Sequence, residues 1–174
     1  MAHKVTVNKL HSSDHEKIII IANWYYNEWG TPIDKTIHRL KNQPSDDTLF
    51  QLILTTSNEI IATGGLCNNV NIFNVYPDLK KHKPWLALLY VEKKYRNNGL
   101  GEILVKEIAQ NAKKNKIEKI YLYTFTAETL YKRCGWKEIQ RLEPLYDSKV
   151  RRSEDSCCWW PSHTSFGGHK IPSG

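Results

Sequence analysis

The sequence predicts an α/β (α+β) protein with a mixed β-sheet flanked by helices. Two observations lead to this fold class. A strand-like run, a helical run and a second strand-like run follow one another over residues 85–125, and such a unit pairs its strands in parallel. Two β-rich runs separated only by "SNE" predict an antiparallel hairpin in the same chain. Together they require a sheet with both kinds of pairing.

The first half of the chain predicts two helices followed by the hairpin. Residues 14–29, "DHEKIIIIANWYYNEW", favour a helix that ends at Gly30. The run "TPIDKTIHRLKNQ" predicts a second helix with Thr31 as its cap and Pro32 in its first turn. The hairpin strands are "TLFQLILTT" and "EIIATGGL".

The second half predicts alternating strands and helices. Residues 68–84 form a polar loop dotted with aromatic residues, long enough to suggest a functional role. The elements expected after it are a fully buried strand "WLALLYV", a helix over 99–115, a strand "KIEKIYLYTF", a short helix "TAETLYKRCGW" ended by Gly135, and a strand "WKEIQRL".

The C-terminal segment differs from the rest of the chain. It has no periodic pattern, and from Pro161 it is rich in Gly, Ser, Pro and His. The segment "DSKVRRSEDSCCWW" is charged where a further strand is expected, so that strand is either short or displaced to "CCWW". We expect one domain over residues 1–150 and an atypical segment over residues 151–174, with at most a last strand and a loose tail.

Composition narrows the class of protein. The chain has 174 residues, enough for one domain with a real core, and no apolar run near the roughly 20 residues that span a bilayer. No secretory signal is recognisable, so we expect a cytoplasmic protein without membrane contact. None of the four cysteines forms a C-x-x-C pair. The spacing of Cys157, Cys158, His163 and His169 does not fit common zinc patterns, so we expect no metal.

The formal net charge of +7 leaves three kinds of partner open: nucleic acid, an acidic surface, or a polyanionic small ligand. No helix-turn-helix or aromatic RNA-binding signature accompanies the lysines. A solvated basic surface explains most of this charge, and a polyphosphate ligand is the best specific alternative.

A glycine loop indicates where an anion would bind. "YRNNGLG", residues 95–101, lies between a predicted strand and a predicted helix, where glycine lets backbone amides approach an anion and the helix dipole favours it. No Lys-Ser/Thr follows Gly101, which excludes the ATP-type P-loop. Leu104 stands where the dinucleotide fingerprint needs its third glycine. A tight strand-to-helix turn without a ligand is the structural alternative.

Two motifs together resemble the GNAT superfamily, the GCN5-related N-acetyltransferases. The pattern V-x-x-x-Y-R-x-x-G-x-G over residues 91–101 is similar to the family's motif A. "TFTAETLYKRCGW" over residues 124–136 is similar to its motif B, with Thr124 where Asn is commonest. The resemblance covers roughly residues 5–142 and implies a mixed sheet of six to seven strands with about four helices.

The resemblance implies acetyl-CoA as the cofactor. The amides of the glycine loop would hold its pyrophosphate, strand backbone near Val91 would contact its pantetheine arm, and Arg96 with nearby lysines would attract its phosphates. The cofactor-binding residues that it implies are Leu89, Tyr90, Val91, Arg96, Asn97, Asn98, Gly99, Leu100, Gly101, Glu102, Thr124 and Tyr131.

The resemblance also implies direct acetyl transfer to a primary amine of a small molecule or peptide. A strand amide near Val91 would polarise the thioester carbonyl. Tyr131 matches the family tyrosine that protonates the leaving thiolate. Glu28 is the candidate base, and Glu92 or a water chain stays an alternative.

Two other classes of function stay open. One is a non-catalytic acyl-CoA-binding or sensing module that keeps the loop without the chemistry. The other, less favoured, is a basic nucleic-acid binder. The sequence leaves the acceptor unnamed, and both a monomer and a homodimer are compatible with it.

Overall fold

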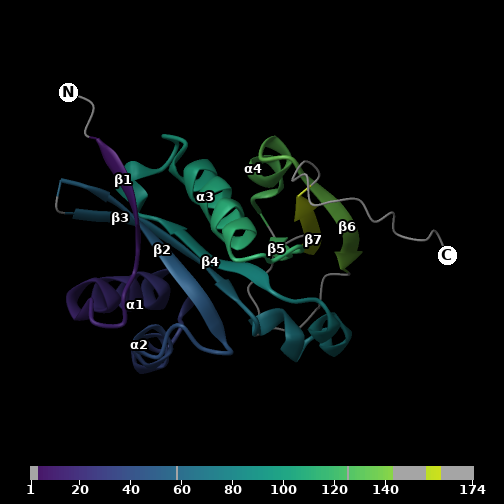
Figure 1. Ribbon diagram of the computed structural model, residues 1–174, viewed down its shortest axis with the longest axis horizontal. Helices are drawn as coiled ribbons and strands as arrows, with labels where there is room; N and C mark the ends of the chain where they lie inside the picture. Colours follow the sequence, from purple (N-terminus) through teal and green to yellow (C-terminus); the bar gives the residue numbers. More distant parts are fainter. Residues whose placement is uncertain (1–3, 58, 125, 143–155, 162–174) are drawn as a thin grey trace.

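The computed structural model describes residues 4–57, 59–124, 126–142 and 156–161, the last segment through its backbone. Within these residues the chain forms seven strands and four α-helices, within the six to seven strands and about four helices that the family resemblance implies (Figure 1). In chain order they are β1 (Val5–Lys9), α1 (His15–Trp29), α2 (Ile33–Lys41), β2 (Thr48–Thr56), β3 (Glu59–Cys67), β4 (Trp85–Val91), α3 (Leu100–Lys114), β5 (Leu122–Thr124), α4 (Glu128–Arg133), β6 (Trp136–Leu142) and β7 (Ser156–Pro161).

The strands form two sheets that meet at one point. The first sheet has the order β1-β2-β3-β4 with antiparallel neighbours, and the second has the order β5-β7-β6. A single parallel bridge between Trp85 and Tyr121 joins β4 to the start of β5. The predicted parallel pairing is therefore present, but it is limited to this one bridge between the first residue of β4 and the residue before β5.

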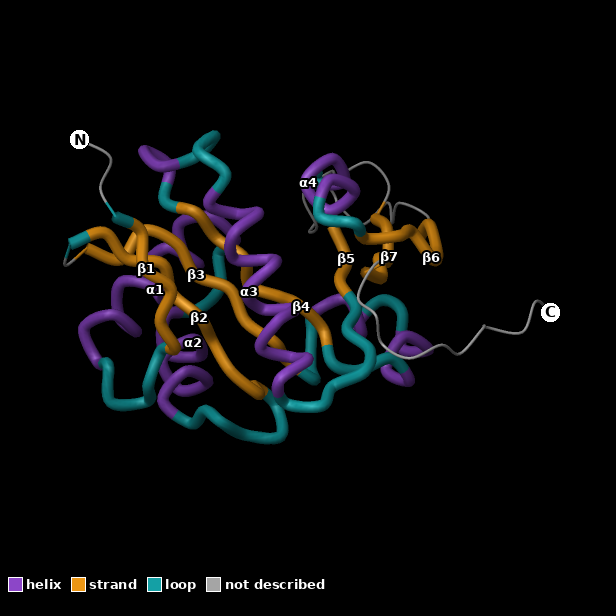
Figure 2. The backbone as a smooth tube through the Cα atoms, turned by 45° about the horizontal axis from the view of Figure 1, so that its top comes forward, coloured by secondary structure: helices purple, strands orange, loops and turns teal. Residues whose placement is uncertain are grey.

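Helices cover both faces of the first sheet. Figure 1 shows α1 and α2 on one face and α3 on the other, and Figure 2 shows α3 lying over the strands of the first sheet. The residues of β2 are nearly all buried because both of its faces are covered. Such a strand reads as a continuous apolar run, which is why "TLFQLILTT" lacks a clean alternation.

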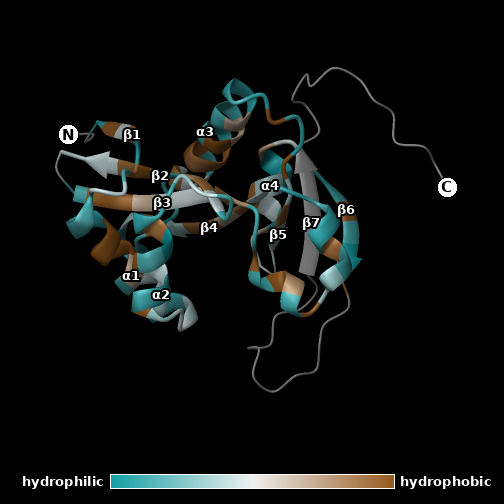
Figure 3. Ribbon diagram, turned by 60° about the horizontal axis from the view of Figure 1, so that its bottom comes forward, coloured by the Kyte–Doolittle hydropathy of each residue, from teal (hydrophilic) through white to brown (hydrophobic). Residues whose placement is uncertain are grey.

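Two apolar clusters correspond to these two faces. The cluster on the α3 face includes Leu104 and Ile108 of α3 together with Leu54 of β2. The cluster on the α1 face includes Ile18 and Ile21, which are fully buried. The hydropathy colouring of Figure 3 shows the brown apolar stretches of α1 and α3. Both helices are therefore held by apolar burial against the sheet.

Several sequence-based predictions need correction. The strand β1 was not predicted, because a five-residue run gives a weak signal. The N-cap of α2 is Pro32 rather than Thr31, and no side chain caps it. The strand β5 covers only Leu122–Thr124 of the longer run predicted for it.

The strand β4 is only partly buried, whereas the sequence predicts full burial. Ala87, Leu88, Leu89 and Val91 all keep some exposure. The reason is that β5 pairs with β7 beyond the bridge, so one edge of β4 has no neighbouring strand among the described residues.

The last strand lies at "CCWW", which is the displaced position, one of the two alternatives predicted from the sequence. The backbone of Ser156–Pro161, which contains "CCWW", pairs antiparallel with both β5 and β6. Residues 143–155 and 162–174 lie outside the described part of the chain. The domain boundary near residue 150 therefore stays a prediction.

Among the described residues, no helix combines the length and the hydropathy of a membrane-spanning segment.

Gly65 provides a test of packing inside the sheet. It pairs directly with Gln51 across β2 and β3, and a methyl group built on it would lie 2.1 Å from the Gln51 side-chain oxygen. We expect Gly65→Ala to lower the free energy of unfolding by about 1–3 kcal/mol through overpacking. Denaturant titration measures the change.

The matched control is Gly101→Ala. Its new methyl group would lie 3.4 Å from Leu130, an ordinary contact, so its unfolding free energy should stay near the wild-type value. Equal stability of the two variants would contradict this account of Gly65.

Candidate active site

The glycine loop ends in an uncapped helix terminus. Asn97 and Gly99 have left-handed backbones, with φ of 64° and 75°, and Gly99 is the N-cap of α3. No side chain caps this end of the helix. The Ile103 amide donates to the Gly99 carbonyl, so the amides of the first turn before it have no partner within the helix. Such a terminus is suited to bind an anion.

Gly101 leaves room beside these amides. Its backbone is not left-handed, and a methyl group there would meet only the flexible Leu130 side chain, at 3.4 Å. The fold therefore tolerates a side chain at this position. The absence of one makes space for a ligand that approaches the backbone.

The Arg96 side chain is held on the α1 side of the loop. Its Nε donates to the Val91 carbonyl at 2.9 Å, and its guanidinium lies 5.3 Å from the centre of the Tyr90 ring. One Nη atom lies 3.3 Å from the Glu28 carboxylate. This ion pair brings two residues predicted for different roles, cofactor binding and catalysis, into direct contact.

The β4 strand offers an unpaired edge. The Leu86 amide donates to the Tyr121 carbonyl at 2.7 Å, and the Tyr121 amide donates to Pro84 at 2.9 Å. Beyond this point β5 turns to β7, and the described residues place no strand beside the free edge of β4. Backbone groups on a free edge can bind the amides of an extended ligand, as an added strand would. Leu89, Tyr90 and Val91 lie on this stretch.

A bulge interrupts β4 in the same region. Its register with β3 shifts between the pairs Thr63–Tyr90 and Gly65–Ala87, so Leu88 and Leu89 lie opposite one residue. Leu88 has a left-handed backbone with φ of 59°. The buried Tyr25 hydroxyl donates to the Leu88 carbonyl at 2.7 Å. Sequence reasoning missed this contact.

Tyr131 and Thr124 lie on the α3 side. Tyr131 projects from α4 into the apolar cluster of α3 and packs edge-on against Trp136, with ring centres 6.0 Å apart. Burial raises the pKa of Tyr131 above its ordinary value, so its hydroxyl stays protonated at neutral pH. The Thr124 hydroxyl accepts a hydrogen bond from the Ala127 amide at 3.0 Å and so fixes the entry to α4.

A cleft of about 700 Å³ lies on the α1 side of the sheet. Trp24 lines it and stacks on Tyr90, with ring centres 5.1 Å apart. Its acidic lining residues are Glu16, Glu59 and Glu92, and its basic ones are Lys17 and Lys94. The Glu92 Oε2 atom is buried without a hydrogen bond from the described residues and lies 3.9 Å from Lys94.

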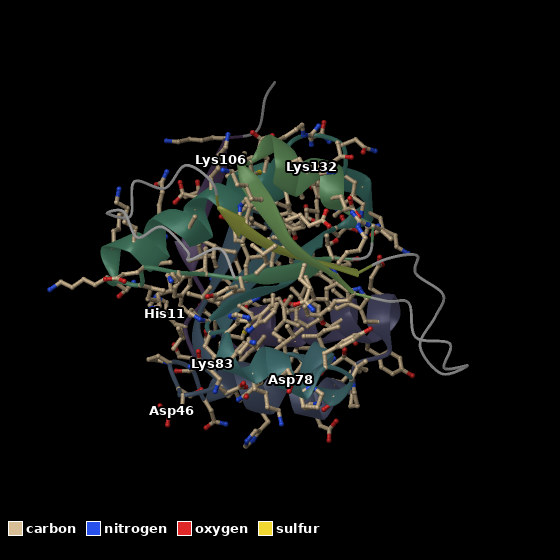
Figure 4. The ribbon with its side chains drawn as sticks, turned by 90° about the vertical axis from the view of Figure 1, so that its right-hand side faces the viewer. His11, Asp46, Asp78, Lys83, Lys106 and Lys132 are labelled. Atoms are coloured by element: carbon tan, nitrogen blue, oxygen red, sulfur yellow. The ribbon has the colours of Figure 1, made fainter. Side chains whose placement is uncertain are left out.

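A smaller hollow of about 290 Å³ lies at the β3–β4 connection. Asp78 and Gln140 are among its lining residues. In Figure 4, Asp78 and Lys83 lie at the lower rim of the molecule, whereas Lys106 and Lys132 lie at the upper rim. This hollow contains none of the predicted site residues.

The described residues contain no group of three or more metal-ligating side chains. Cys67 and Cys134 are free thiols. The side chains of Cys157, Cys158, His163 and His169 lie outside the described part of the structure.

A comparison with protein families finds one match, to the acetyltransferase (GNAT) family, over residues 16–136. The match includes the glycine loop, the free edge of β4, and the whole of α4 with the turn that follows it. No curated protein matches the chain.

Solved structures share the fold. An aminoglycoside 6'-acetyltransferase type Ii superposes with a TM-score of 0.66 at 14% identity, covering 95% of this chain and 99% of that one. The ribosomal-protein-S18-alanine N-acetyltransferase of Escherichia coli gives 0.64 at 15% identity, covering 96% and 100%.

A third structure contains a ligand. It is a Bacillus anthracis protein assigned as a streptothricin acetyltransferase, in complex with acetyl coenzyme A. It gives a TM-score of 0.52 at 24% identity over 71% of this chain, which spans 65% of that protein's length. At these identities the three structures establish the fold.

Gly101→Ala tests the anion site without disturbing the fold. The methyl group should crowd the helix amides, and we expect the Kd for coenzyme A to rise about tenfold, equivalent to about 1.4 kcal/mol. Isothermal titration calorimetry measures the affinity. Lys114→Ala, at the other end of the same helix, is the control and should bind as the wild type does. A Kd that Gly101→Ala leaves unchanged would remove this helix terminus from the site.

Proposed function

Because the chain belongs to the GNAT family of acetyltransferases, we propose that it transfers the acetyl group of acetyl-CoA directly to a primary amine of a small molecule or peptide. The observation that supports this most is the uncapped start of α3 beside the free edge of β4. The first can bind a diphosphate, and the second can bind an amide-bearing arm.

The predicted cofactor residues fit a long ligand of this kind. The amides around Gly99 and Gly101 would hold its pyrophosphate. The backbone of Leu89, Tyr90 and Val91 would face its pantetheine arm. Acetyl-CoA supplies an activated acetyl group, and the chain orients it, which contributes several kcal/mol to a reaction between two bound molecules.

Tyr131 is the proposed acid. As the amine nitrogen forms its bond to the acetyl carbon, the carbon–sulfur bond breaks and the sulfur needs a proton. The Tyr131 hydroxyl stays protonated and donates to no acceptor among the described residues, so its O–H is available to the sulfur. Solvent would then restore its proton.

Glu28 is the proposed base, with Glu92 as the alternative. Glu28 lies at the end of α1, and its carboxylate is held by Arg96 at 3.3 Å. Glu92 lines the cleft on the same side of the sheet. A carboxylate on this side could take the proton that the amine loses.

The cleft with Trp24, Tyr95 and Glu92 supports a cationic amine as acceptor. Its aromatic and acidic lining suits an alkylammonium group. Two structural neighbours are named for very different acceptors, an alanine of a ribosomal protein and an aminoglycoside. The acceptor class proposed for this chain is therefore broad.

An amine panel tests the activity. Purified protein with acetyl-CoA should release free thiol only when its acceptor is present, and Tyr131→Phe should lower kcat about 100-fold, in the range for loss of a general acid. The Kd for acetyl-CoA should change little. Since burial raises the Tyr131 pKa above 10.0, the wild-type rate should show no loss from its deprotonation up to that pH.

Two results would contradict the proposed activity or the proposed role of Tyr131. Tight acetyl-CoA binding without thiol release on any amine would identify an acyl-CoA-binding module. Loss of rate and affinity to the same extent in Tyr131→Phe would make that residue structural.

A matched pair of variants, Glu28→Gln and Glu92→Gln, tests which of the two carboxylates is the base. Loss of the base should lower kcat about 100-fold. We expect this of Glu28→Gln, whereas Glu92→Gln should keep the wild-type kcat. The reverse pattern would transfer the role to Glu92, and a wild-type kcat in both variants would favour a water chain.

A further inference from the structure

A buried chain of hydrogen bonds runs from α1 through β2 and β3 to the β4 bulge. The Tyr25 hydroxyl donates to the Leu88 carbonyl at 2.7 Å. The Gln51 Nε2 atom donates to the Tyr25 oxygen at 3.0 Å and to the Thr63 oxygen at 2.7 Å. Thr63 donates to the Leu52 carbonyl at 2.9 Å. Tyr25, Gln51 and Thr63 are 1%, 0% and 0% exposed.

The direction of every bond in this chain is fixed. A carbonyl oxygen can only accept, so Tyr25 donates to Leu88 and Thr63 donates to Leu52. Both hydroxyl oxygens then accept from the Gln51 amide, which uses both of its N–H bonds. These hydrogen bonds therefore have only one possible arrangement, and they hold the Leu88 carbonyl in one direction.

The buried hydrogen-bond chain lowers the stability of the fold in two ways, so stability does not explain why it is there. The Gln51 Oε1 atom is buried without a hydrogen bond from the described residues. Its side chain also requires a glycine at position 65, where a methyl group would lie 2.1 Å away. Apolar residues would fill the same space without an unpaired polar atom. A role beyond packing explains a buried polar chain better.

The carbonyl that Tyr25 holds belongs to the peptide at the bulge. Leu88 has a φ of 59°, which is rare for a leucine and persists only when its surroundings impose it. Leu88 and Leu89 together lie opposite one residue of β3. The peptide between them is trans and planar, so the Leu89 N–H points away from the Leu88 carbonyl and from Tyr25.

We propose that Tyr25, supported by Gln51 and Thr63, is a positioning residue for acetyl transfer. It fixes the peptide between Leu88 and Leu89 so that the Leu89 N–H donates to the thioester carbonyl oxygen of acetyl-CoA. The sequence motif placed this donor near Val91, but the bulge that Tyr25 holds lies earlier on β4. The inference rests on the proposed function.

The test compares the bound thioester in wild type and Tyr25→Phe, which removes only the hydroxyl. Infrared difference spectra of acetyl-CoA labelled with ¹³C at the acetyl carbonyl report the hydrogen bond to that oxygen directly. In the variant we expect the bound carbonyl stretch at higher frequency. The preference for acetyl-CoA over coenzyme A should fall about threefold or more, because only acetyl-CoA has this carbonyl. With the acceptor from the amine panel, kcat should fall about tenfold or more.

Two controls separate positioning from stability. Ile21→Val loosens the packing of the same buried helix face without touching the hydrogen bonds, and Tyr26→Phe alters the exposed neighbour. Both should keep the wild-type frequency and ligand preference. A frequency that Tyr25→Phe leaves unchanged, or that Ile21→Val shifts equally, would overturn the proposal.

If Tyr25→Phe does not fold, a second variant still tests the proposal. Thr63→Val releases the far end of Gln51 and should raise the frequency in the same direction by a smaller amount, whereas no change would overturn the proposal. The spectra need binding but no turnover. If acetyl-CoA binds without acetylating any amine, the amine panel rejects the proposed function on its own. If wild type does not bind acetyl-CoA, both proposals fail.

Discussion

The candidate site depends on the separation of β4 and β5, which diverge after a single bridge. Trp85 and Tyr121 join the two sheets at a single position, and β7 takes the place beside β5 that β4 leaves. A sheet that continued through this point would pair every backbone group of β4 with protein. Because it does not, the edge that bears Leu89 is available to a ligand, and the start of α3 lies just beyond the end of β4.

Side chains from α1 and the glycine loop hold two backbone carbonyls of β4. The Leu88 carbonyl accepts from Tyr25 and the Val91 carbonyl accepts from Arg96, which in turn pairs with Glu28. Two carbonyls of β4 are therefore satisfied by side chains. The same contacts tie the end of α1 to both the bulge and the anion loop, so the two ends of the expected ligand share one support.

Features set by short-range sequence were predictable, and those set by tertiary pairing were not. The end of α1 at Gly30 and the loop at Gly99 follow from residues that tolerate a left-handed backbone. The bulge at Leu88 was hidden because leucine does not indicate such a conformation. The Glu28–Arg96 pair joins residues far apart in the chain. A usable signal did exist for the buried hydrogen-bond chain: Gln51 is the one polar residue inside the apolar stretch "LFQLIL".

The position of β7 has a consequence for the order in which the protein is made. The first sheet is complete once β4, ending at Val91, has been synthesised. The second sheet has its central strand at Ser156–Pro161, so β5 and β6 have no partner until the ribosome has added that segment. Domains generally fold as units. On the nascent chain, the side of the site that carries Tyr131 therefore cannot be complete until Ser156–Pro161 has been added, long after the part that contains Tyr25 and Leu88.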